Sequence, residues 1–402
     1  MRIETQRRID RFIGAPLCRL LSLLPAPSER QGAPSTILVV LLSEMGSLVL
    51  ADPLFQRLKR KYPQARICAL VSRNNGEVLA TLDAVPDTEV YTLRTHSLVA
   101  FLRDSVAVVR RLRRLELDVV IDCELFSRVS AILSRLSGAR VRVGFHRHRQ
   151  EGLYRGDFIN RPVPYNPYRH IARQFLTLVE AIESSSVPPV KRRLAEDHLA
   201  LRPLSLDTGE LDAMRHRLER DFPRVRTARL VLLYAGGGLI PVRAWPLSSF
   251  QELAARLVEA GLLVGVIGLD GDKPLARAIQ DRVGRERAID LTGYTRNVRE
   301  VMVLFHLAEL LITNDGGPGH FAAKTPIRSV ILYGPETPVL YGSLDPHSVC
   351  LYKGLSCSPC LSAYNHRNSP CDGDNQCLKT ISVDEVFEKA MSLLPIDDER
   401  TW

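Results

Sequence analysis

The chain has 402 residues, too many for one ordinary hydrophobic core, so its length predicts two domains. Hydrophobic residues make up 45% and charged residues 25%, as in soluble globular proteins, and no stretch is apolar enough to span a bilayer. The net charge of +9 favours an acidic partner, such as nucleic acid, anionic lipid or a phosphorylated glycan. Nucleic acid is the weakest of these, because no RNA-reading motif and no run of interleaved aromatic residues is present. No cleavable signal peptide is visible, which favours the cytosol.

Residues 1–34 differ in composition from the rest of the chain. Hydrophobic residues recur at helical spacing and arginines lie between them, which predicts a basic amphipathic helix, bent or restarted at Pro16. The helix either lies on the anionic inner face of the cytoplasmic membrane or packs on its own protein or a second subunit. On the membrane interpretation, removing residues 1–30 leaves the fold intact and weakens membrane association. A linker rich in proline follows, up to Pro34. The hydrophobic residues are Ile9, Phe12, Ile13, Leu17, Leu20, Leu21 and Leu24, and the arginines are Arg7, Arg8, Arg11 and Arg19.

Residues 35–190 alternate between short apolar runs and helical patterns. Strands are expected at about 36–42, 66–71, 89–93, 118–122 and 140–144, with helices between them. Such alternation with short turns predicts a doubly wound parallel sheet, that is, a Rossmann-like domain. Residues 191–225 are expected to connect it to the second domain.

The same pattern starts again over residues 226–402, with strands expected at about 228–234, 262–268, 288–291, 310–313 and 329–333. The strand ending at Thr313 leads into Asn314-Asp315-Gly316-Gly317-Pro318-Gly319-His320, a polar, glycine-rich turn that starts a helix. Such a turn lets a phosphate approach the free N–H groups of the helix, and Asp315 can accept hydrogen bonds from sugar hydroxyls. Many glycine-rich turns between a strand and a helix bind nothing, so the motif alone leaves that alternative open.

A basic loop follows the strand at 140–144. It contains Arg147, His148 and Arg149, and a loop at the carboxyl end of a strand faces the ligand crevice of an open sheet. The loop is therefore a candidate site for an acidic acceptor. The alternative is an ordinary solvated basic loop.

With these motifs taken together, the chain resembles glycosyltransferase family 9, the ADP-heptose:lipopolysaccharide heptosyltransferases, over about residues 36–390. The order and spacing of four motifs carry the resemblance. It implies a GT-B architecture, in which two Rossmann-like domains face each other across a cleft. The motifs are Ile37-Leu38-Val39-Val40-Leu41-Leu42-Ser43 through Gly46 with Asp52-Pro53, Arg243-Ala244-Trp245-Pro246, Thr313 to His320, and Leu332-Tyr333-Gly334-Pro335-Glu336-Thr337-Pro338.

The resemblance also implies an inverting transfer, with a nucleotide sugar, usually ADP-heptose, in the C-terminal domain and an acidic lipid-linked glycan acceptor in the N-terminal domain. No cofactor would be needed for the chemistry, because a basic side chain and helix N-termini neutralise the diphosphate. Arg243 would take that basic role, Asp315 would bind sugar hydroxyls, and the backbone of the glycines after it would meet the diphosphate. The full implied donor site is Gly236, Gly237, Gly238, Arg243, Thr292, Gly293, Asp315, Gly316, Gly317, Gly319 and His320.

The chain departs from the family at the presumed catalytic base. Relatives carry Asp directly after the glycine of the first turn, where this chain has Ser47, and a serine at its ordinary pKa is a poor base. Glu44 on the same turn is the best replacement, and Asp52 is another carboxylate nearby. A third possibility is that the base is lost and the protein transfers poorly or only binds.

Four cysteines gather near the C-terminus: Cys357, Cys360, Cys371 and Cys377, within residues 357–377. Four thiolates suit a structural zinc ion, with His366 as a substitute ligand, although the C-x5-C half is looser than in a standard zinc ribbon. Iron is a possible occupant in some members of the family that the chain resembles. Reduced thiols or a pair of disulfides are the alternatives.

The leading hypothesis is a glycosyltransferase of cell-envelope glycan synthesis, cytoplasmic and peripheral on the inner membrane face. The alternatives are a catalytically impaired sugar-nucleotide-binding or scaffolding protein, which Ser47 favours, and a transferase with another donor or acceptor. The presence of Arg243 and Asp315 argues against an inactive protein, which has less need of a complete donor site.

Overall fold

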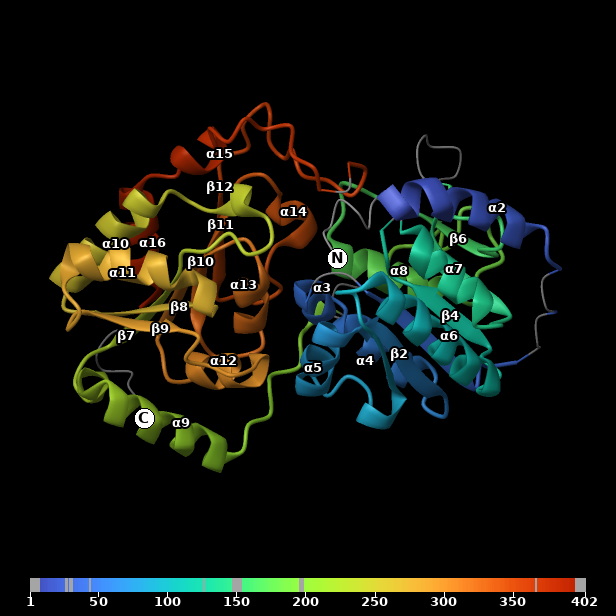
Figure 1. Cartoon of the computed structure of the whole chain (residues 1–402), viewed down its shortest axis with the longest axis horizontal. Coiled ribbons are helices and arrows are strands. Elements are labelled where there is room, and N and C mark those ends of the chain that lie inside the picture. Colours follow the sequence, from blue (N-terminus) through green and yellow to red (C-terminus); the bar gives the residue numbers. More distant parts are fainter. Residues whose placement is uncertain are drawn as a thin grey trace. The chain divides into compact units, whose positions relative to one another are not determined.

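The computed structural model describes residues 8–25, 28, 32–42, 45–125, 127–146, 154–194, 199–365 and 367–394. The chain divides into two compact units, residues 1–200 and residues 201–402. Each unit is an α/β structure with one parallel sheet (Figure 1). The two units are described separately below.

The described part of the first unit contains a six-stranded sheet with the order β3-β2-β1-β4-β5-β6. All five strand pairs are parallel, and Val39 at the centre of β1 pairs with Ala69 of β2 and Ile121 of β4. The central strands are almost wholly apolar because helices cover both faces of such a sheet. The strands are β1 (Thr36–Leu41), β2 (Arg66–Ser72), β3 (Val90–Leu93), β4 (Val119–Asp122), β5 (Val141–His146) and β6 (Arg161–Pro164).

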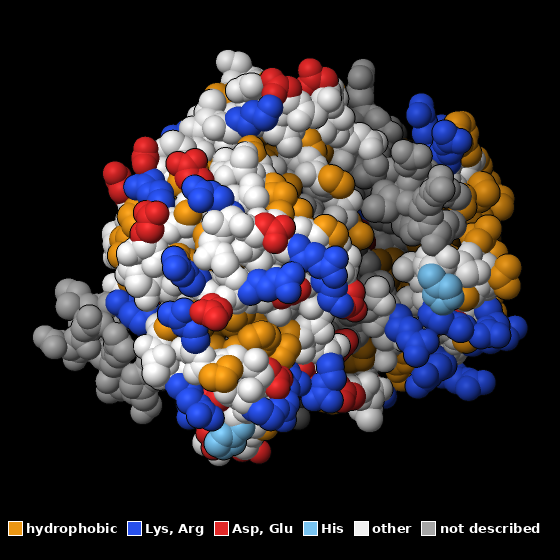
Figure 2. All heavy atoms as spheres, turned by 60° about the vertical axis from the view of Figure 1, so that its left-hand side comes forward, with side chains coloured by type: hydrophobic (Ala, Val, Ile, Leu, Met, Phe, Trp, Pro, Cys, Tyr) orange, Lys and Arg blue, Asp and Glu red, His pale blue; other side chains and the backbone are white. Residues whose placement is uncertain are grey.

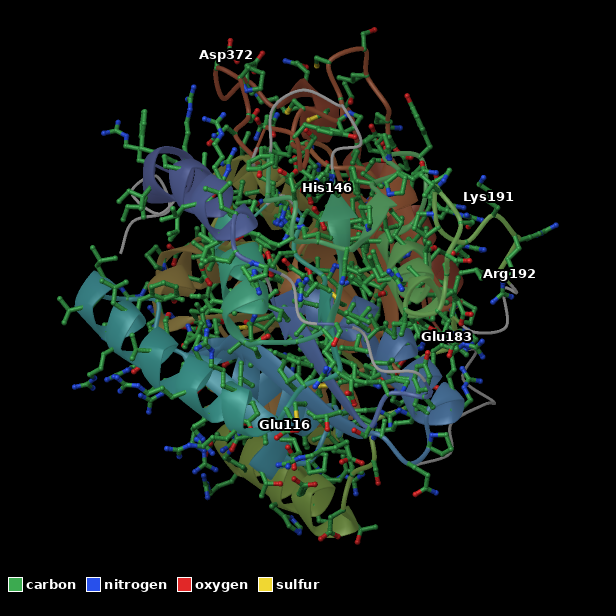
Figure 3. All side chains as sticks on the ribbon, turned by 90° about the vertical axis from the view of Figure 1, so that its right-hand side faces the viewer. Glu116, His146, Glu183, Lys191, Arg192 and Asp372 are labelled. Atoms are coloured by element: carbon green, nitrogen blue, oxygen red, sulfur yellow. The ribbon has the colours of Figure 1, made fainter. Side chains whose placement is uncertain are left out.

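Helices α3 to α8 alternate with the strands of the first unit along the chain. Helix α7 contacts both α2 and α6, so these three helices share one face of the sheet, while α4 packs against α8. Figure 3 shows α2 and α6 on the same side of this unit. The helices are the π-helix η1 (Asp10–Gly14), α2 (Ala15–Ser22), α3 (Met45–Leu50), α4 (Asp52–Lys61), α5 (Arg73–Thr81), η2 (Asp87–Glu89), α6 (Leu98–Arg114), α7 (Arg128–Leu136) and α8 (Ile171–Ala181).

The N-terminal helix is built into the first unit along one of its faces. Asp10 Oδ1 accepts hydrogen bonds from the backbone N–H groups of Arg128 (2.9 Å) and Val129 (3.0 Å), at the start of α7. Cys18 and Leu21 are buried in a small apolar cluster with residues of α7 and of the segment before β6. Pro16 does not break the helix. The π-helix η1 leads directly into α2, which contains Pro16 in its first turn. The buried face of this helix therefore packs against its own protein.

The segment after α8 is held by ion pairs. The Glu180 carboxylate forms ion pairs with Arg57 Nε at 2.7 Å and with Arg192 Nη2 at 2.5 Å. Glu183 forms an ion pair with Lys61 Nζ at 3.1 Å. Glu183 and Arg192 lie at the same edge of the unit in Figure 3. These contacts fasten the chain to α4 just before it leaves the first unit.

The described part of the second unit also has a six-stranded parallel sheet, with the order β12-β11-β10-β7-β8-β9. Its core combines inward residues of these strands with helices α10 and α16, and the largest buried side chain in it is Trp245. The strands are β7 (Leu230–Tyr234), β8 (Leu263–Gly268), β9 (Ala288–Thr292), β10 (Leu310–Asn314), β11 (Arg328–Tyr333) and β12 (Ser348–Tyr352).

The helices of the second unit begin inside the segment expected to be a connection. Helix α9 (Thr208–Asp221) has a capping box, in which Asp207 and Glu210 satisfy each other's backbone N–H groups. The remaining helices are η4 (Pro223–Arg226), η5 (Pro241–Arg243), α10 (Leu247–Glu259), η6 (Asp270–Asp272), α11 (Lys273–Val283), α12 (Val298–Phe305), α13 (Gly317–Ala322), α14 (Pro338–Tyr341), α15 (Gln376–Lys379) and α16 (Val383–Leu393).

Candidate active site

The predicted donor residues lie in one row along the second sheet. Parallel strands all end at the same edge, and β11, β10, β7, β8 and β9 are neighbours in that order. Each predicted donor residue lies at, or shortly after, the carboxyl end of β10, β7 or β9. Open α/β sheets bind their ligands outside this edge.

Asn314, the last residue of β10, connects three segments: the turn after β7, the segment Arg243–Trp245 and the turn that begins at Asp315. Its side-chain Oδ1 accepts a hydrogen bond from the N–H of Trp245 at 2.9 Å, and its Nδ2 donates to the carbonyl of Gly236 at 3.0 Å. The side chain is fully buried, so both hydrogen bonds are made away from water. The turn after β7 and the Arg243–Trp245 segment are therefore held against the Asp315 turn.

A buried cluster of acidic and basic groups lies next to this junction. Arg243 Nε is 3.5 Å from Asp315 Oδ2, and Arg243 Nη2 donates to Glu336 Oε2 at 2.7 Å. Arg367 Nε pairs with Glu336 Oε1 at 3.1 Å. Asp315, Glu336 and Arg243 are each less than a tenth exposed. The structure thus brings together the predicted pair Arg243 and Asp315, and adds Glu336 and Arg367.

The two carboxyl groups of this cluster are not ordinary carboxylates. Burial raises the pKa of Glu336 to about 8, Arg243 opposes this shift, and the neighbouring Asp315 adds to it. Burial also raises the pKa of Asp315, against the lowering effect of Arg243 and of the neighbouring Glu336. Charges in an environment poor in water interact strongly, so the ionisation of one group in this cluster affects that of the others.

The helix that follows Asp315 is short and closely packed. A Cβ atom on Gly319 would lie 2.9 Å from Ile331 Cδ1, so glycine at this position lets α13 pack on β11. His320 is buried on the same helix. Packing explains Gly319 without a ligand, while Gly316 has open space around its Cα and leaves room for one.

At the other end of the row, Thr292 and Gly293 follow β9. The N–H of Thr292 donates to Asp290 Oδ1 at 2.9 Å. Gly293 has φ +69°, and a Cβ there would meet Asp270 Oδ1 at 2.4 Å, so only glycine fits. A Cβ on Gly236 would lie 3.0 Å from an oxygen of Asp272. Asp270 and Asp272, which sequence reasoning did not select, thus border this end of the row.

The candidate catalytic residues of the first unit are only partly described. Glu44 lies outside the described residues. Ser47 is half-buried within α3, and Asp52 is fully buried at the start of α4, where its Oδ2 accepts a hydrogen bond from Gln56 Nε2 at 3.0 Å. Glu124, which the sequence did not single out, accepts a hydrogen bond from the N–H of Leu42 at 2.6 Å. Glu124 thereby anchors the chain just before the first turn.

The predicted acceptor residues Arg147, His148 and Arg149 lie outside the described residues. His146 is the last residue of β5, and Figure 3 labels it at the end of that strand. Beyond the loop, Arg155 is fully buried and pairs with Asp122, which also accepts a hydrogen bond from Ser130. Arg155 Nη1 donates to the carbonyl of Phe145 at 2.7 Å. The segment after the loop is therefore fixed to the ends of β4 and β5.

The four cysteines are free thiols with unequal exposure. Cys357 and Cys371 are exposed, Cys360 is half-buried and Cys377 is buried. Burial raises the pKa of Cys377, and the neighbouring Cys360, Cys357 and Cys371 raise it further, so the four side chains lie near one another. Across the described residues, however, no three cysteine, histidine or carboxylate side chains are arranged to hold a metal ion. The thiols suit zinc chemically, but in this arrangement they do not form a metal site, and His366 lies outside the described residues.

The face of the first unit that carries α2, α7 and α6 exposes apolar side chains beside arginines. On α6, Val99 is 77%, Leu102 55% and Val106 50% exposed, on the side opposite the buried Val108 and Leu112. Figure 2 shows exposed hydrophobic side chains next to Lys and Arg on the molecular surface. Within the described residues, no helix is long and apolar enough to cross a membrane. The other exposed apolar residues of this surface are Phe12, Ile13, Leu20, Leu23 and Leu24, and its exposed arginines include Arg11, Arg19, Arg103, Arg110 and Arg113.

Two doubly wound parallel sheets, with an acidic and basic cluster at the glycine-rich carboxyl edge of the second, give the architecture of the GT-B fold class. The structure of ADP-heptose LPS heptosyltransferase II from E. coli superposes with a TM-score of 0.68, at 20% identity, over 89% of this chain and 98% of that chain.

Curated relatives give the same class. Lipooligosaccharide heptosyltransferase 2 of Haemophilus influenzae is 22% identical over 75% of this chain and 84% of its own length. Lipopolysaccharide heptosyltransferase 2 of Salmonella typhimurium is 24% identical over 89% of this chain and 98% of its own. Residues 105–369 match the family described as "Glycosyltransferase family 9 (heptosyltransferase)". The chain belongs to glycosyltransferase family 9, so the predicted family, fold class and enzyme class are confirmed.

Proposed function

We propose that this protein transfers a heptose, with inversion, from an ADP-sugar to an acidic lipid-linked glycan acceptor in lipopolysaccharide or cell-envelope synthesis. The observation that carries the proposal is the pairing of Arg243 with Asp315 at the carboxyl end of β10, beside Gly316. A guanidinium neutralises a diphosphate, and a carboxylate fixed 3.5 Å from it accepts hydrogen bonds from sugar hydroxyls. The relatives with heptosyltransferase names support heptose as the sugar.

The donor would lie along the row of strand ends. Its diphosphate would meet Arg243 and the backbone of Gly316 and Gly317, and its nucleoside would lie toward Thr292 and Gly293. Gly236 to Gly238 would form the wall between these two ends, since Asn314 holds Gly236 against the Asp315 turn. Asp270 and Asp272, which lie beside Gly293 and Gly236, would accept hydrogen bonds from ribose hydroxyls at that end.

Glu44 is our first choice for the base that removes the acceptor proton. Ser47 is a poor base, because a serine hydroxyl at its ordinary pKa does not readily take a proton from the acceptor. Asp52 is fully buried and bound to Gln56, which favours a structural role at the start of α4. An acceptor site at the loop with Arg147, His148 and Arg149 completes the proposal, because an acidic glycan needs basic partners.

A second candidate function is a catalytically impaired protein that binds a sugar nucleotide. Ser47, in the position where relatives carry Asp, is the observation that favours it. One measurement separates the two functions: either protein would bind the donor, but only an active transferase would consume it.

We also propose that this protein acts as a peripheral protein on the cytoplasmic, anionic face of the inner membrane. The exposed apolar residues of α2 and α6 lie on one side of the first unit with arginines beside them, as in helices that lie in a bilayer interface. Leu23→Glu and Leu102→Glu should each reduce sedimentation with phosphatidylglycerol-containing vesicles. Val187→Glu is the matched control, because Val187 is 74% exposed and follows α8, which packs against α4 and not on this face. Equal sedimentation of all three variants would refute the membrane surface.

A structural zinc or iron ion at Cys357, Cys360, Cys371 and Cys377 is a further part of the proposal, supported by the proximity of the four thiols. The segment would have to close around the ion, because the described thiols do not form a site as they stand. Elemental analysis of the purified protein should find one zinc or iron per chain, which Cys377→Ser loses and Cys350→Ser keeps. Metal-free wild-type protein with an intact fold would refute it.

The first test of the main proposal is calorimetric titration with ADP-heptose, beside GDP-mannose and UDP-glucose. Selective binding of ADP-heptose is expected, and Asp315→Ala should abolish it while Asp281→Ala, an exposed carboxylate of α11, should not. Absence of ADP-heptose binding in the folded wild-type protein would overturn the donor assignment. Binding without turnover on a lipopolysaccharide acceptor would favour the second candidate function.

A further inference from the structure

Glu336 belongs to the buried cluster at the donor site, but neither the sequence motif nor the family comparison gives it a role. It follows β11 and lies between two guanidinium groups, with Arg243 Nη2 at 2.7 Å and Arg367 Nε at 3.1 Å. The same Arg243 guanidinium has its Nε 3.5 Å from Asp315 Oδ2, so it holds the two carboxyl groups close together. The residue is 2% exposed and Asp315 is 6% exposed, so bulk water cannot separate the two carboxyl groups.

Two buried carboxyl groups held this close can form a hydrogen bond with each other only if one of them carries a proton. Asp315 Oδ2 and Glu336 Oε1 are both buried, and within the described chain neither receives a well-formed hydrogen bond from an N–H or O–H group. Two adjacent carboxylates without water would repel each other strongly, whereas one shared proton removes the repulsion and fills a missing hydrogen bond. Burial raises the pKa of both carboxyl groups, and the neighbouring Asp315 raises that of Glu336 further, which agrees with one proton held by the pair.

We propose that Glu336 is a protonated positioning residue, which donates a hydrogen bond to Asp315 and leaves the donor site with a net positive charge. The hydrogen bond fixes the Asp315 carboxylate for the sugar hydroxyls. With both guanidinium groups charged and one carboxyl group neutral, two positive charges face a single negative charge. A diphosphate is attracted to such a site, and a second carboxylate would remove the excess charge. This inference rests on the donor site proposed above.

Tyr333 and Cys350, two other titratable groups near the pair, stay neutral through the same pH range. Burial raises the pKa of Tyr333, whose hydroxyl donates to the carbonyl of Tyr341, and it also raises the pKa of Cys350. Tyr341 lies under the guanidinium of Arg367, 5.2 Å from it. His320, buried on α13, is common to all the variants compared below. Loss of the Glu336 proton is therefore the event that changes the charge of this cluster as the pH rises past about 8.

The test is calorimetric titration of the full chain with ADP from about pH 7 to about pH 9.5. Wild-type affinity should fall by roughly tenfold for each pH unit above 8, since one proton is lost from the binding form. Glu336→Gln keeps a neutral hydrogen-bond donor, so it should match the wild type within about threefold at neutral pH and lose the alkaline fall. Glu336→Asp keeps an ionisable group and should keep the fall. Glu309→Gln, which removes the ion pair of Glu309 with Arg229, is the control and should follow the wild type.

Each outcome decides between the two proposals. ADP binding by no variant, in folded protein near pH 7, would defeat the donor site itself. An alkaline fall that persists in folded Glu336→Gln, or a loss of more than about tenfold near pH 7 in that variant, would overturn the role of Glu336 alone. If Glu336→Gln does not fold, a flat wild-type profile between pH 7 and pH 9.5 would still overturn it. A fall shared by wild type and Glu336→Asp would support it.

Discussion

Adjacent leucines in the N-terminal helix should separate folding from membrane binding. Leu21 is 7% exposed and packs in the cluster of Cys18, Ala131 and Phe158, whereas Leu20 is 62% exposed on the same helix. Replacing a buried leucine by alanine removes its transfer free energy and leaves a cavity, so Leu21→Ala should cost roughly 2–3 kcal/mol of unfolding free energy. At about 2–4 °C per kcal/mol for a unit of this size, its melting temperature should fall by roughly 4–12 °C. Leu20→Ala should stay within about 0.5 kcal/mol of the wild type.

Vesicle binding should show the reverse pattern. Leu20→Ala removes apolar surface that is free to enter a bilayer interface, so it should weaken sedimentation with anionic vesicles, while Leu21→Ala should not. Differential scanning calorimetry and co-sedimentation of the same two preparations make the comparison. Equal melting temperatures for the two variants would refute the packing argument. The contacts of Leu21 and Asp10 also argue against the expectation that residues 1–30 can be removed without effect on the fold.

Three further predictions follow from the site and its surroundings. Glu44→Gln should leave donor binding intact and abolish transfer, and turnover near that of the wild type would exclude Glu44 as the base. Ser47→Asp should raise turnover in an acceptor assay if the base is lost in this chain; unchanged turnover would indicate that another group already acts. Burial raises the pKa of Glu300. The N–H of Arg296 and the Arg217 guanidinium lower the pKa by more than burial raises it, so its net value is about 2. Since the folded pKa lies below the unfolded one, this stabilisation is present above about pH 4.5 and is lost as the pH falls toward 2. Acid titration of unfolding should therefore be less steep for Glu300→Gln, and an identical titration would contradict the assignment.

Apolar periodicity was sufficient to predict two doubly wound parallel sheets and their central strands, and the family resemblance added the GT-B class. Buried parallel strands are continuous runs of branched residues, and β1, β2, β7, β8 and β10 all have that pattern. Two edge strands were missed. Strand β6 contains two prolines in four residues, and the residues of β12 are mostly half-buried, so neither shows a continuous buried pattern. Helix α9 was assigned to the connection because its apolar residues are sparse, although its capping box was readable at Asp207 and Glu210.

The donor site was predictable in its motifs but not in its electrostatics. Asp315 and Arg243 were selected because a carboxylate and a guanidinium in those motifs suit a sugar diphosphate. Glu336 was part of a quoted motif, yet nothing in its neighbours along the chain shows that it lies beside Asp315. That proximity comes from the pairing of β10 with β11, which brings the two strand ends together. Arg367 comes from a loop about thirty residues further on, and no spacing rule connects it to Glu336.

Asn314 shows why the site needs the whole second sheet. Its two side-chain hydrogen bonds reach Trp245 and Gly236, which belong to segments that follow β7, about seventy to eighty residues earlier in the chain. Because β7 is the neighbour of β10, a single amide can hold both segments, and Arg243 is two residues from the bonded Trp245. The position of Arg243 over Asp315 is therefore set by backbone hydrogen bonds as well as by charge. Replacing Arg243 removes its charge and its hydrogen bond to Glu336, whereas replacing Asn314 would release the loop that carries Arg243.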